Sequence, residues 1–114
     1  MEMEFSHRDV DHARIVDVKG ALNILNANDL RDFFEECVAQ NHTKIVLNLH
    51  GVHYIDSSGL GTLIKAKTDI RKAGGNLILI NVGESVDDVF RVTGVTVFLE
   101  IHESEEDALA SLED

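Results

Sequence analysis

The sequence predicts an α/β fold in which a single mixed β-sheet is packed with about four helices. Short apolar runs alternate with stretches of helical periodicity in the order β-β-α-β-α-β-α-β-α, and strand–helix–strand steps form parallel crossovers. Residues 45–49 and 77–80 are almost entirely apolar on both faces, as in central strands covered by helices on each side. A short polar connection joins the first two expected strands, which favours an antiparallel hairpin at the start of the sheet.

Length and composition indicate one globular domain that spans residues 1–114. Hydrophobic residues make up 44% of the chain and charged residues 27%, so the chain can form a core. The net charge of −11 disfavours nucleic acid and anionic membranes as partners, because both bind clusters of lysine and arginine. A basic protein surface or a cationic pocket suits this charge better, although a solvated acidic surface explains it equally well. No stretch approaches 18 apolar residues and no basic leader is present, which favours a cytoplasmic protein.

Residues 1–6 alternate apolar and polar side chains, which is the period of a half-buried strand. The polar residues 8–12 are expected to form a turn, and residues 13–19 are expected to form a second strand. Gly20 interrupts the pattern, so the asparagine-rich residues 21–28 are predicted to form a loop.

The apolar residues of the next segment have full helical periodicity: Leu30, Phe33, Phe34, Cys37 and Val38. Asn26 with Asp29 three residues later predicts the start of this helix, and Asn41 predicts its end. The single cysteine belongs to the apolar face, which predicts core packing and no disulfide, as in a reducing cytosol.

Residues 44–49 are the third predicted strand, and a helix follows over about 57–73, ended by two glycines. Residues 77–80 are predicted to form the fourth strand. Ser85 with Asp88 predicts the start of a short helix, which Gly94 ends.

Residues 95–101 are rich in valine and are predicted to form the last strand. Ser104 precedes three acidic residues and is expected to cap a closing helix.

The segment that joins the third strand to the second helix is Asp56, Ser57, Ser58, Gly59, Leu60 and Gly61. Two glycines in a first helical turn oppose helix formation, each by up to about 1 kcal/mol relative to alanine, and such conflicts often mark functional positions. We expect the glycines to keep the surface low, so that a partner can approach the two hydroxyls. A tight turn with a capping Asp56 is the alternative. Because sites in α/β sheets gather at the carboxyl ends of strands, the functional interpretation is favoured.

Catalytic and ligand-binding patterns are incomplete around this segment. The G-x-S-x-G pattern of a serine nucleophile fails at both serines, which leaves a small hydrolase as a distant hypothesis. The phosphate-binding pattern G-x-x-x-x-G-K-[ST] is absent, and Asp56 would repel a bound phosphate. His50 and His53 lack an obvious third ligand, so no metal is expected. We expect no cofactor and no enzymatic activity.

Modification of a hydroxyl is the remaining chemistry. A phosphate on Ser57 or Ser58 adds about −1.5 to −2 charge beside Asp56 at neutral pH. At a docking surface this charge repels a partner, whereas the N-terminus of a helix tolerates it. Phosphorylation would therefore switch binding and leave the fold intact.

Five segments in order carry a family resemblance: I-V-L-N-L at 45–49, Y-I-D-S-S-G-L-G at 54–61, A-G-G at 73–75 leading into 77–81, V-F-R-V-T-G at 89–94 and E-S-E-E-D-A-L at 103–109. Over essentially its whole length the chain resembles the STAS domains, in particular the bacterial anti-sigma factor antagonists.

The resemblance implies a partner switch. In such proteins the unmodified antagonist binds an anti-sigma factor that is also a serine kinase, which frees the sigma factor. The kinase phosphorylates the serine directly after the aspartate, here Ser57, and binding is lost until a serine phosphatase restores it. Asp56 would help to present this serine, and the rest of 56–61 would belong to the contact surface. The alternative is a scaffold or sensor STAS domain that is not phosphorylated, within a larger signalling or lipid-transport assembly.

One position departs from the family pattern. The family often has G-x-L-D at the end of the second strand, and its aspartate helps partner binding; the matching residues here end in Asn23. We expect Asn23 in the binding surface, where its amide can hydrogen-bond but cannot form a salt bridge to a kinase arginine or lysine. A loop residue that satisfies local backbone groups is the alternative.

Overall fold

The computed structural model describes residues 2–113, so Met1 and Asp114, the ends of the predicted domain, lie outside the described residues. The strands are β1 (Met3–Val10), β2 (Ala13–Leu22), β3 (Lys44–Ile55), β4 (Asn76–Ile80) and β5 (Ile101–His102). The helices are α1 (Ala27–Ala39), α2 (Ser57–Lys72), α3 (Glu84–Thr93), the short 3-10 helix η1 (Val95–Phe98) and α4 (Glu105–Ser111).

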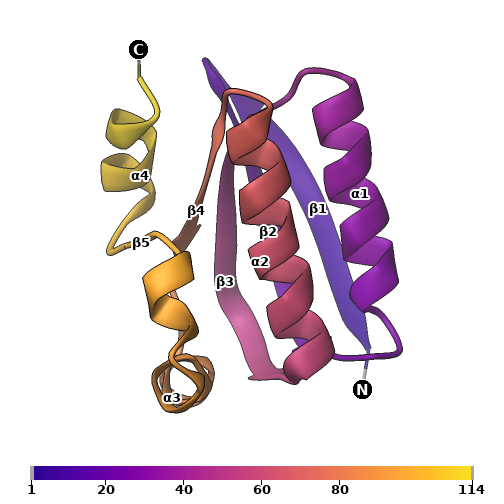
Figure 1. Cartoon of the computed structure of the whole chain (residues 1–114). Helices are drawn as coiled ribbons and strands as arrows, with labels where there is room; N and C mark the ends of the chain where they lie inside the picture. The colour runs from indigo at the N-terminus through magenta and orange to yellow at the C-terminus, as the bar shows by residue number, and fades with distance from the viewer. Residues whose placement is uncertain (1, 114) are drawn as a thin grey trace.

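The predicted mixed sheet is confirmed. Its strands lie in sequence order, β1 pairs with β2 antiparallel, and every later pair is parallel (Figure 1). None of the helices within residues 2–113 is long and apolar enough to cross a membrane.

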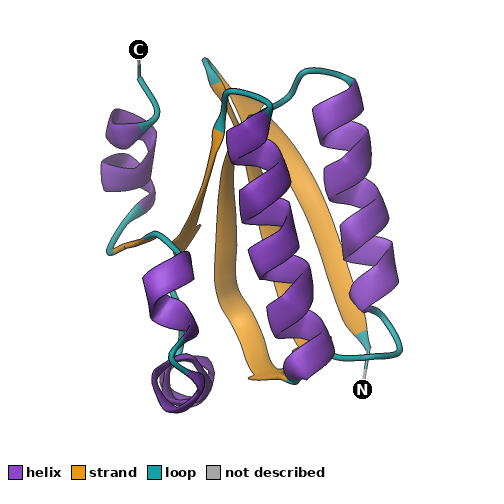
Figure 2. Cartoon of the chain, viewed as in Figure 1, coloured by secondary structure: helices purple, strands orange, loops and turns teal. Residues whose placement is uncertain are grey.

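The core lies on both faces of the sheet. Neighbouring residues of a strand point to opposite faces, so Val46 and Leu47 of β3 belong to different apolar clusters. Leu47 lies in the larger cluster, to which α1, α2 and α3 contribute, and Val46 lies in a smaller one completed by α4. Figure 2 shows α1 and α2 side by side across one face. Burial on both faces explains why the central strands are nearly continuous apolar runs.

The parallel pairing of β2 and β3 brings their carboxyl ends to the same edge of the sheet, where Leu22 lies opposite Ile55. After β2 the chain reaches α1 through residues 23–26, and after β3 it enters α2 through Asp56 alone. Both helices therefore begin at this edge, at the lower end of Figure 1.

The first hairpin is longer than predicted. Residues 8–10 were expected in a turn, but β1 continues through them and only Asp11 and His12 connect the strands. Arg8 explains the difference, because its guanidinium bonds Asp17 on β2 at 3.1 Å and Glu105 on α4 at 2.7 Å. Asp11 closes the turn with φ 48, a conformation that aspartate tolerates better than most residues.

Gly20 does not end the second strand as predicted. β2 continues to Leu22, and its register against β3 shifts between Gly20 and Ala21. Gly20 has φ 103, and an added Cβ would lie 2.0 Å from the carbonyl oxygen of Glu2. The glycine therefore permits a bulge within the strand.

The predicted strand over residues 95–101 is wrong. Residues 95–98 form η1, and only Ile101 and His102 pair with β4, opposite Leu79 and Ile80. Valine-rich sequence favours a strand only where a neighbouring strand offers hydrogen bonds, and β4 ends at Ile80.

Two of the expected helix caps are confirmed and two differ. Asp56 accepts a hydrogen bond from Gly59 N at 3.0 Å, and Ser104 accepts one from Asp107 N at 3.1 Å. Asn26 precedes α1 as predicted, but its side chain makes no capping bond to the helix. Ser85 lies inside α3, where its hydroxyl donates to the carbonyl of His53 at 3.0 Å.

Cys37 is a free, buried thiol on α1, which confirms its predicted place in the core. Burial raises the pKa of this thiol, and hydrogen bonding from Arg14 offsets only part of the effect. Arg14 Nη1 lies 3.6 Å from Cys37 Sγ while its Nε bonds Asp9 at 2.8 Å. The cysteine thus packs beside the buried guanidinium of Arg14, whose ion-pair partner Asp9 is exposed.

Candidate functional site

Asp56 ties the beginning of α2 to the loop before α1. One carboxylate oxygen accepts from Gly59 N at 3.0 Å, which caps α2, and the other accepts from Ile24 N at 3.1 Å. The backbone N–H of Asp56 donates to Leu22 O at 3.1 Å. Two segments 32 residues apart in sequence are therefore held as one surface by a single residue.

Residues 23–26 form a closed turn. The side-chain oxygen of Asn23 accepts from Leu25 N at 2.9 Å, and the Asn23 carbonyl accepts from Ala27 N at 2.8 Å. Asn26 Oδ1 accepts from Asn23 N at 2.9 Å, while its Nδ2 donates to Ala21 O at 2.7 Å. Asn23 is only 9% exposed, so its amide oxygen serves the local backbone, as the alternative interpretation expects.

The two serines differ in exposure. Ser57, the first residue of α2, is exposed, and Ser58 is half-buried. Among the described residues, the Ser57 hydroxyl has no hydrogen-bond partner, and the Ser58 carbonyl accepts a bond from the Thr62 hydroxyl at 3.1 Å. The hydroxyl most open to another protein is therefore that of Ser57.

The two glycines of the segment have different roles, which corrects the expectation that both keep the surface low. Gly59 is buried, and an added Cβ would lie 2.8 Å from both Leu22 O and Ile55 Cγ1. Gly61 is exposed, and an added Cβ would meet nothing within 4 Å. Leu60 is also buried. Gly59 and Leu60 thus anchor α2 on the sheet, and Gly61 faces outward.

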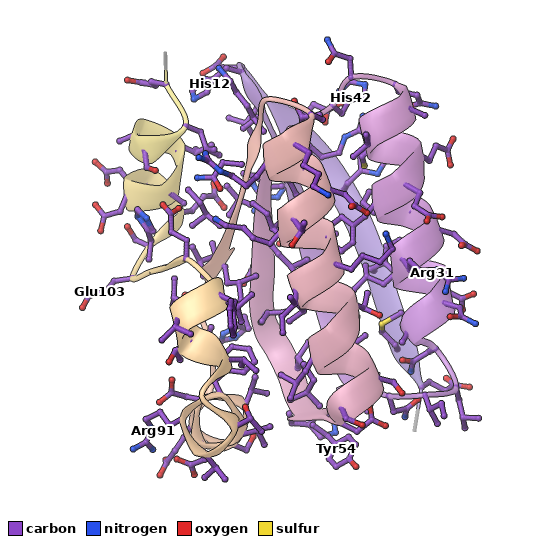
Figure 3. The ribbon with its side chains drawn as sticks, in the orientation of Figure 1. His12, Arg31, His42, Tyr54, Arg91 and Glu103 are labelled. Carbon is purple, nitrogen blue, oxygen red and sulfur yellow. The ribbon has the colours of Figure 1, made fainter. Side chains whose placement is uncertain are left out.

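Sequence reasoning missed three exposed apolar residues around this corner. Ile24 is 72% exposed, Leu25 is 85% exposed and Tyr54 is 44% exposed. Figure 3 shows Tyr54 at the end of the molecule where α2 begins, opposite the end that carries His12 and His42. Two consecutive aliphatic residues, Ile24 and Leu25, in a segment predicted to be a loop were the signal available in the sequence, since a contiguous exposed apolar patch marks an interaction surface.

Two cations, one from each helix, share a hollow with Ser58. Arg31 of α1 and Lys65 of α2 line the same hollow as Ser58 and Gly61. A hydrogen bond to Asp69 raises the pKa of Lys65, so this side chain is charged at every physiological pH. Both cations also contact aspartates, Arg31 with Asp32 at 3.6 Å and Lys65 with Asp69 at 2.7 Å, but neither aspartate lines this hollow.

Histidines and carboxylates do not gather at this corner. His50 and His53 are both exposed on β3. Within residues 2–113 no group of three or more histidine, cysteine, aspartate or glutamate side chains is arranged to hold a metal ion.

Residues 4–108 match a family model described as the STAS domain. The anti-sigma F factor antagonist of Paenibacillus polymyxa is 30% identical over 114 residues, which cover 99% of this chain and 94% of the relative. The anti-sigma-B factor antagonist of Listeria monocytogenes is 27% identical over 101 residues, which cover 89% of this chain and 88% of the relative.

A solved structure has the same fold. The crystal structure of an anti-sigma factor antagonist from Mycobacterium paratuberculosis matches with a TM-score of 0.87, over 99% of this chain and 96% of that one. The two sequences are 22% identical, so this likeness concerns the arrangement of the sheet and helices alone.

Proposed function

This chain belongs to the STAS domain family, and we propose that it is an anti-sigma factor antagonist that releases its partner when Ser57 is phosphorylated. Relatives that align with most of the chain carry the name of anti-sigma factor antagonist, which supports the first half of the proposal. One observation carries the second half: an exposed serine hydroxyl lies at the start of a helix, directly after the aspartate that fixes that start. In this scheme the protein is a substrate and a binding module, and not an enzyme.

The surface around Ser57 suits a reversible protein contact. Ile24, Leu25 and Tyr54 supply apolar area beside the hydroxyl, and burying apolar area contributes about 25 cal/mol per Å². A phosphate placed in the same contact carries about −1.5 to −2 charge and loses its hydration when a partner covers it. The penalty of burying a charge exceeds the gain from a small apolar patch, so phosphorylation releases the partner.

The fold itself tolerates the phosphate. Ser57 is the first helical residue of α2, where free backbone N–H groups and the helix dipole favour negative charge. Asp56 opposes this through its own charge, but it holds α2 and the loop by hydrogen bonds that do not involve the Ser57 hydroxyl. The switch therefore changes the surface and not the fold.

The proposed partners follow from the resemblance to anti-sigma factor antagonists. A serine kinase, which is the anti-sigma factor itself in this scheme, transfers the γ-phosphoryl group of ATP to Ser57 Oγ, and ADP leaves while the hydroxyl proton passes to a base on the kinase. A serine phosphatase hydrolyses the phosphoester and restores binding. Asp56 presents the serine to the kinase and Ser58 is its neighbour. The site of action in this scheme is the cytoplasm, with no nucleic acid or membrane contact by this chain.

The test is a binding and phosphorylation assay with purified anti-sigma factors from the same cell. We expect one of them to bind the unmodified protein and, with ATP, to add a single phosphate at Ser57, located by peptide mass mapping. Ser57→Asp should keep the circular dichroism spectrum and melting temperature of the wild type and lose binding by at least about 100-fold, since it places a charge in the contact. Ser58→Ala is the matched control and should still be phosphorylated.

A folded Ser57→Asp variant that binds as tightly as the wild type would contradict the switch. Binding of an anti-sigma factor without phosphorylation at any serine would instead favour the alternative of a scaffold or sensor domain.

A further inference from the structure

A groove runs between α1 and α2, away from Ser57, and it is made of two connected hollows. The hollow beside Ser58 and the next one along the helices share three lining residues, Arg31, Thr62 and Lys65. The two helices begin at the same edge of the sheet and lie side by side, so the groove continues the candidate binding surface (Figure 1).

The hollow beside Ser58 is basic. Its lining residues are Ile24, Ala27, Asn28, Arg31, Ser58, Gly61, Thr62 and Lys65. This lining contains two cations and no carboxylate, although the chain as a whole has a net charge of −11. Arg31 contacts Asp32 at 3.6 Å and Lys65 contacts Asp69 at 2.7 Å, and both carboxylates lie outside this hollow. Gly61 has no side chain to fill it.

The second hollow has an apolar floor. It is lined at its base by Phe34, Val38, Ala66 and Ile70, and its volume is about 160 Å³. Glu35 and Asp69 line it as well, so its rim carries both signs of charge beside Arg31 and Lys65. A space of this size accepts a ring or a branched aliphatic group, as engineered apolar cavities of similar volume do. Phe34, Ala66 and Ile70 are buried members of the main core, so this floor is rigid.

We propose that the α1–α2 groove is a second contact for the anti-sigma factor, which inserts an apolar side chain between Val38 and Ala66 and places an acidic residue against Arg31 and Lys65. The proposal rests on the proposed function, because it assigns the groove to the same partner. Two observations select this occupant: the groove is continuous with the surface at Ser57, and the hollow through which it opens there is lined by Arg31 and Lys65 without a carboxylate, whereas Glu35 and Asp69 line only the inner hollow.

This second contact gives the partner specificity that the corner alone does not supply. Asp56, Ser57 and the apolar loop engage the partner at the point of phosphorylation, while the groove selects an acidic residue followed by an apolar one. Opposite charges across a contact speed association and reject wrong partners. An apolar anchor in a small pocket is the kind of residue that dominates binding energy.

The experiment uses the full chain and the purified anti-sigma factor that binds it, with dissociation constants measured by titration calorimetry. Lys65→Glu should weaken binding about tenfold or more, because it reverses a charge at the groove opening. Lys72→Glu is the matched control, since it makes the same change of net charge on the same helix at an exposed position outside the groove. Gly61→Gln should also weaken binding about tenfold or more by filling the groove, without opposing the fold.

A second readout does not depend on substitutions. In 15N-labelled protein, addition of the anti-sigma factor should shift the backbone amide signals of Val38, Ala66 and Ile70 as well as those near Ser57. Shifts confined to residues 22–25 and 54–58, or equal binding by Lys65→Glu and Lys72→Glu, would overturn the groove contact. If the groove variants bind like the wild type while Ser57→Asp still abolishes binding, the groove inference fails and the proposed function stands. If no anti-sigma factor binds the wild type, both the groove inference and the proposed function fail.

Discussion

At the scale of single residues, Asp56 decides the geometry of the corner. Its two carboxylate oxygens bond Gly59 N and Ile24 N, and its own N–H bonds Leu22 O. The capping bond was predictable from the position of an aspartate before a helical run. The bond to Ile24 was not, because no local pattern reveals which loop lies against a residue 32 positions away.

Asp56→Ala should lower the free energy of unfolding by about 1–2 kcal/mol, because it removes a helix cap and leaves Ile24 N without its acceptor. Asp56→Asn is the control: an asparagine oxygen can still accept one of the two bonds, so this variant should lose about half as much. Urea denaturation followed by circular dichroism measures both. Equal losses for alanine and asparagine would show that the charge, and not the hydrogen bonds, stabilises the corner.

At the scale of elements, α2 carries two glycines that look alike in sequence and differ in structure. Gly59 lies against Leu22 and Ile55, and Gly61 faces open space. Helix propensity treats the two positions equally, so sequence alone could not assign one to packing and the other to the surface. The outcome depends on where the end of β2 lies, which is a tertiary property.

Replacement by alanine should have opposite effects on stability at Gly59 and at Gly61. Gly59→Ala should destabilise the protein by about 1–3 kcal/mol, because its Cβ would overlap Leu22 O and Ile55 Cγ1. Gly61→Ala should stabilise it by up to about 1 kcal/mol, since alanine favours the helix and meets no neighbour. Thermal unfolding of the two variants beside the wild type measures both shifts, and shifts of the same sign would contradict this account of α2.

Sequence patterns reveal local periodicity but not tertiary contacts, and this explains which elements could be predicted. The amphipathic helices α1 and α2 and the apolar strand β4 follow from periodicity, and all three lie where they were expected. The predictions for the end of β1 and for residues 95–98 were wrong because both regions depend on distant partners. Arg8 at the end of β1 contacts Glu105 of α4, and only two residues of β5 pair with β4. The sequence motif was enough to predict the candidate residues 56–61. The exposure of Ile24 and Tyr54 at the same corner could be seen only in the folded structure.

At the scale of the whole molecule, Glu100 joins elements that are distant in sequence. Its carboxylate accepts bonds from Lys67 of α2 at 3.3 Å, Asn76 of β4 at 3.0 Å and Ser111 of α4 at 3.4 Å. His102 of β5 lies 2.9 Å from the same carboxylate. This cluster fixes the C-terminal part of the chain to the sheet without a long β5.

The cluster predicts a loss of stability in acid. Burial acts to raise the pKa of Glu100, but hydrogen bonds from Asn76 and His102 and the charge of Lys67 outweigh it and lower the pKa to about 2. Because the folded-state pKa lies below the ordinary value of 4.5, the stabilisation is complete above pH 4.5 and is lost as the pH falls toward 2. The carboxylate is more than one-third exposed, so we expect a contribution of only about 1 kcal/mol.

Comparison of the wild type with Glu100→Gln from pH 7 to pH 2 measures this contribution. The difference in unfolding free energy should be largest at pH 5–7 and should shrink as the pH falls below 4.5. Hydrogen bonding to Arg14 lowers the pKa of Asp9, and bonds from Arg8 and Asn48 lower that of Asp17 against the effect of burial. Asp9 and Asp17 titrate in the wild type and in Glu100→Gln alike. The difference in unfolding free energy between the two proteins therefore reports on Glu100 alone. A difference that does not vary with pH would contradict the assignment.

The double attachment of Asp56 has a consequence for the rate at which a partner docks. Because Gly59, Ile24 and Leu22 already hold the corner in place, docking has little backbone left to order. The conformational entropy lost on association is then confined to exposed side chains such as Leu25 and Tyr54. Under the proposed function, we expect such a surface to dock as a rigid body, so that the concentration of unmodified protein, and not a rearrangement within it, sets how quickly the partner is captured.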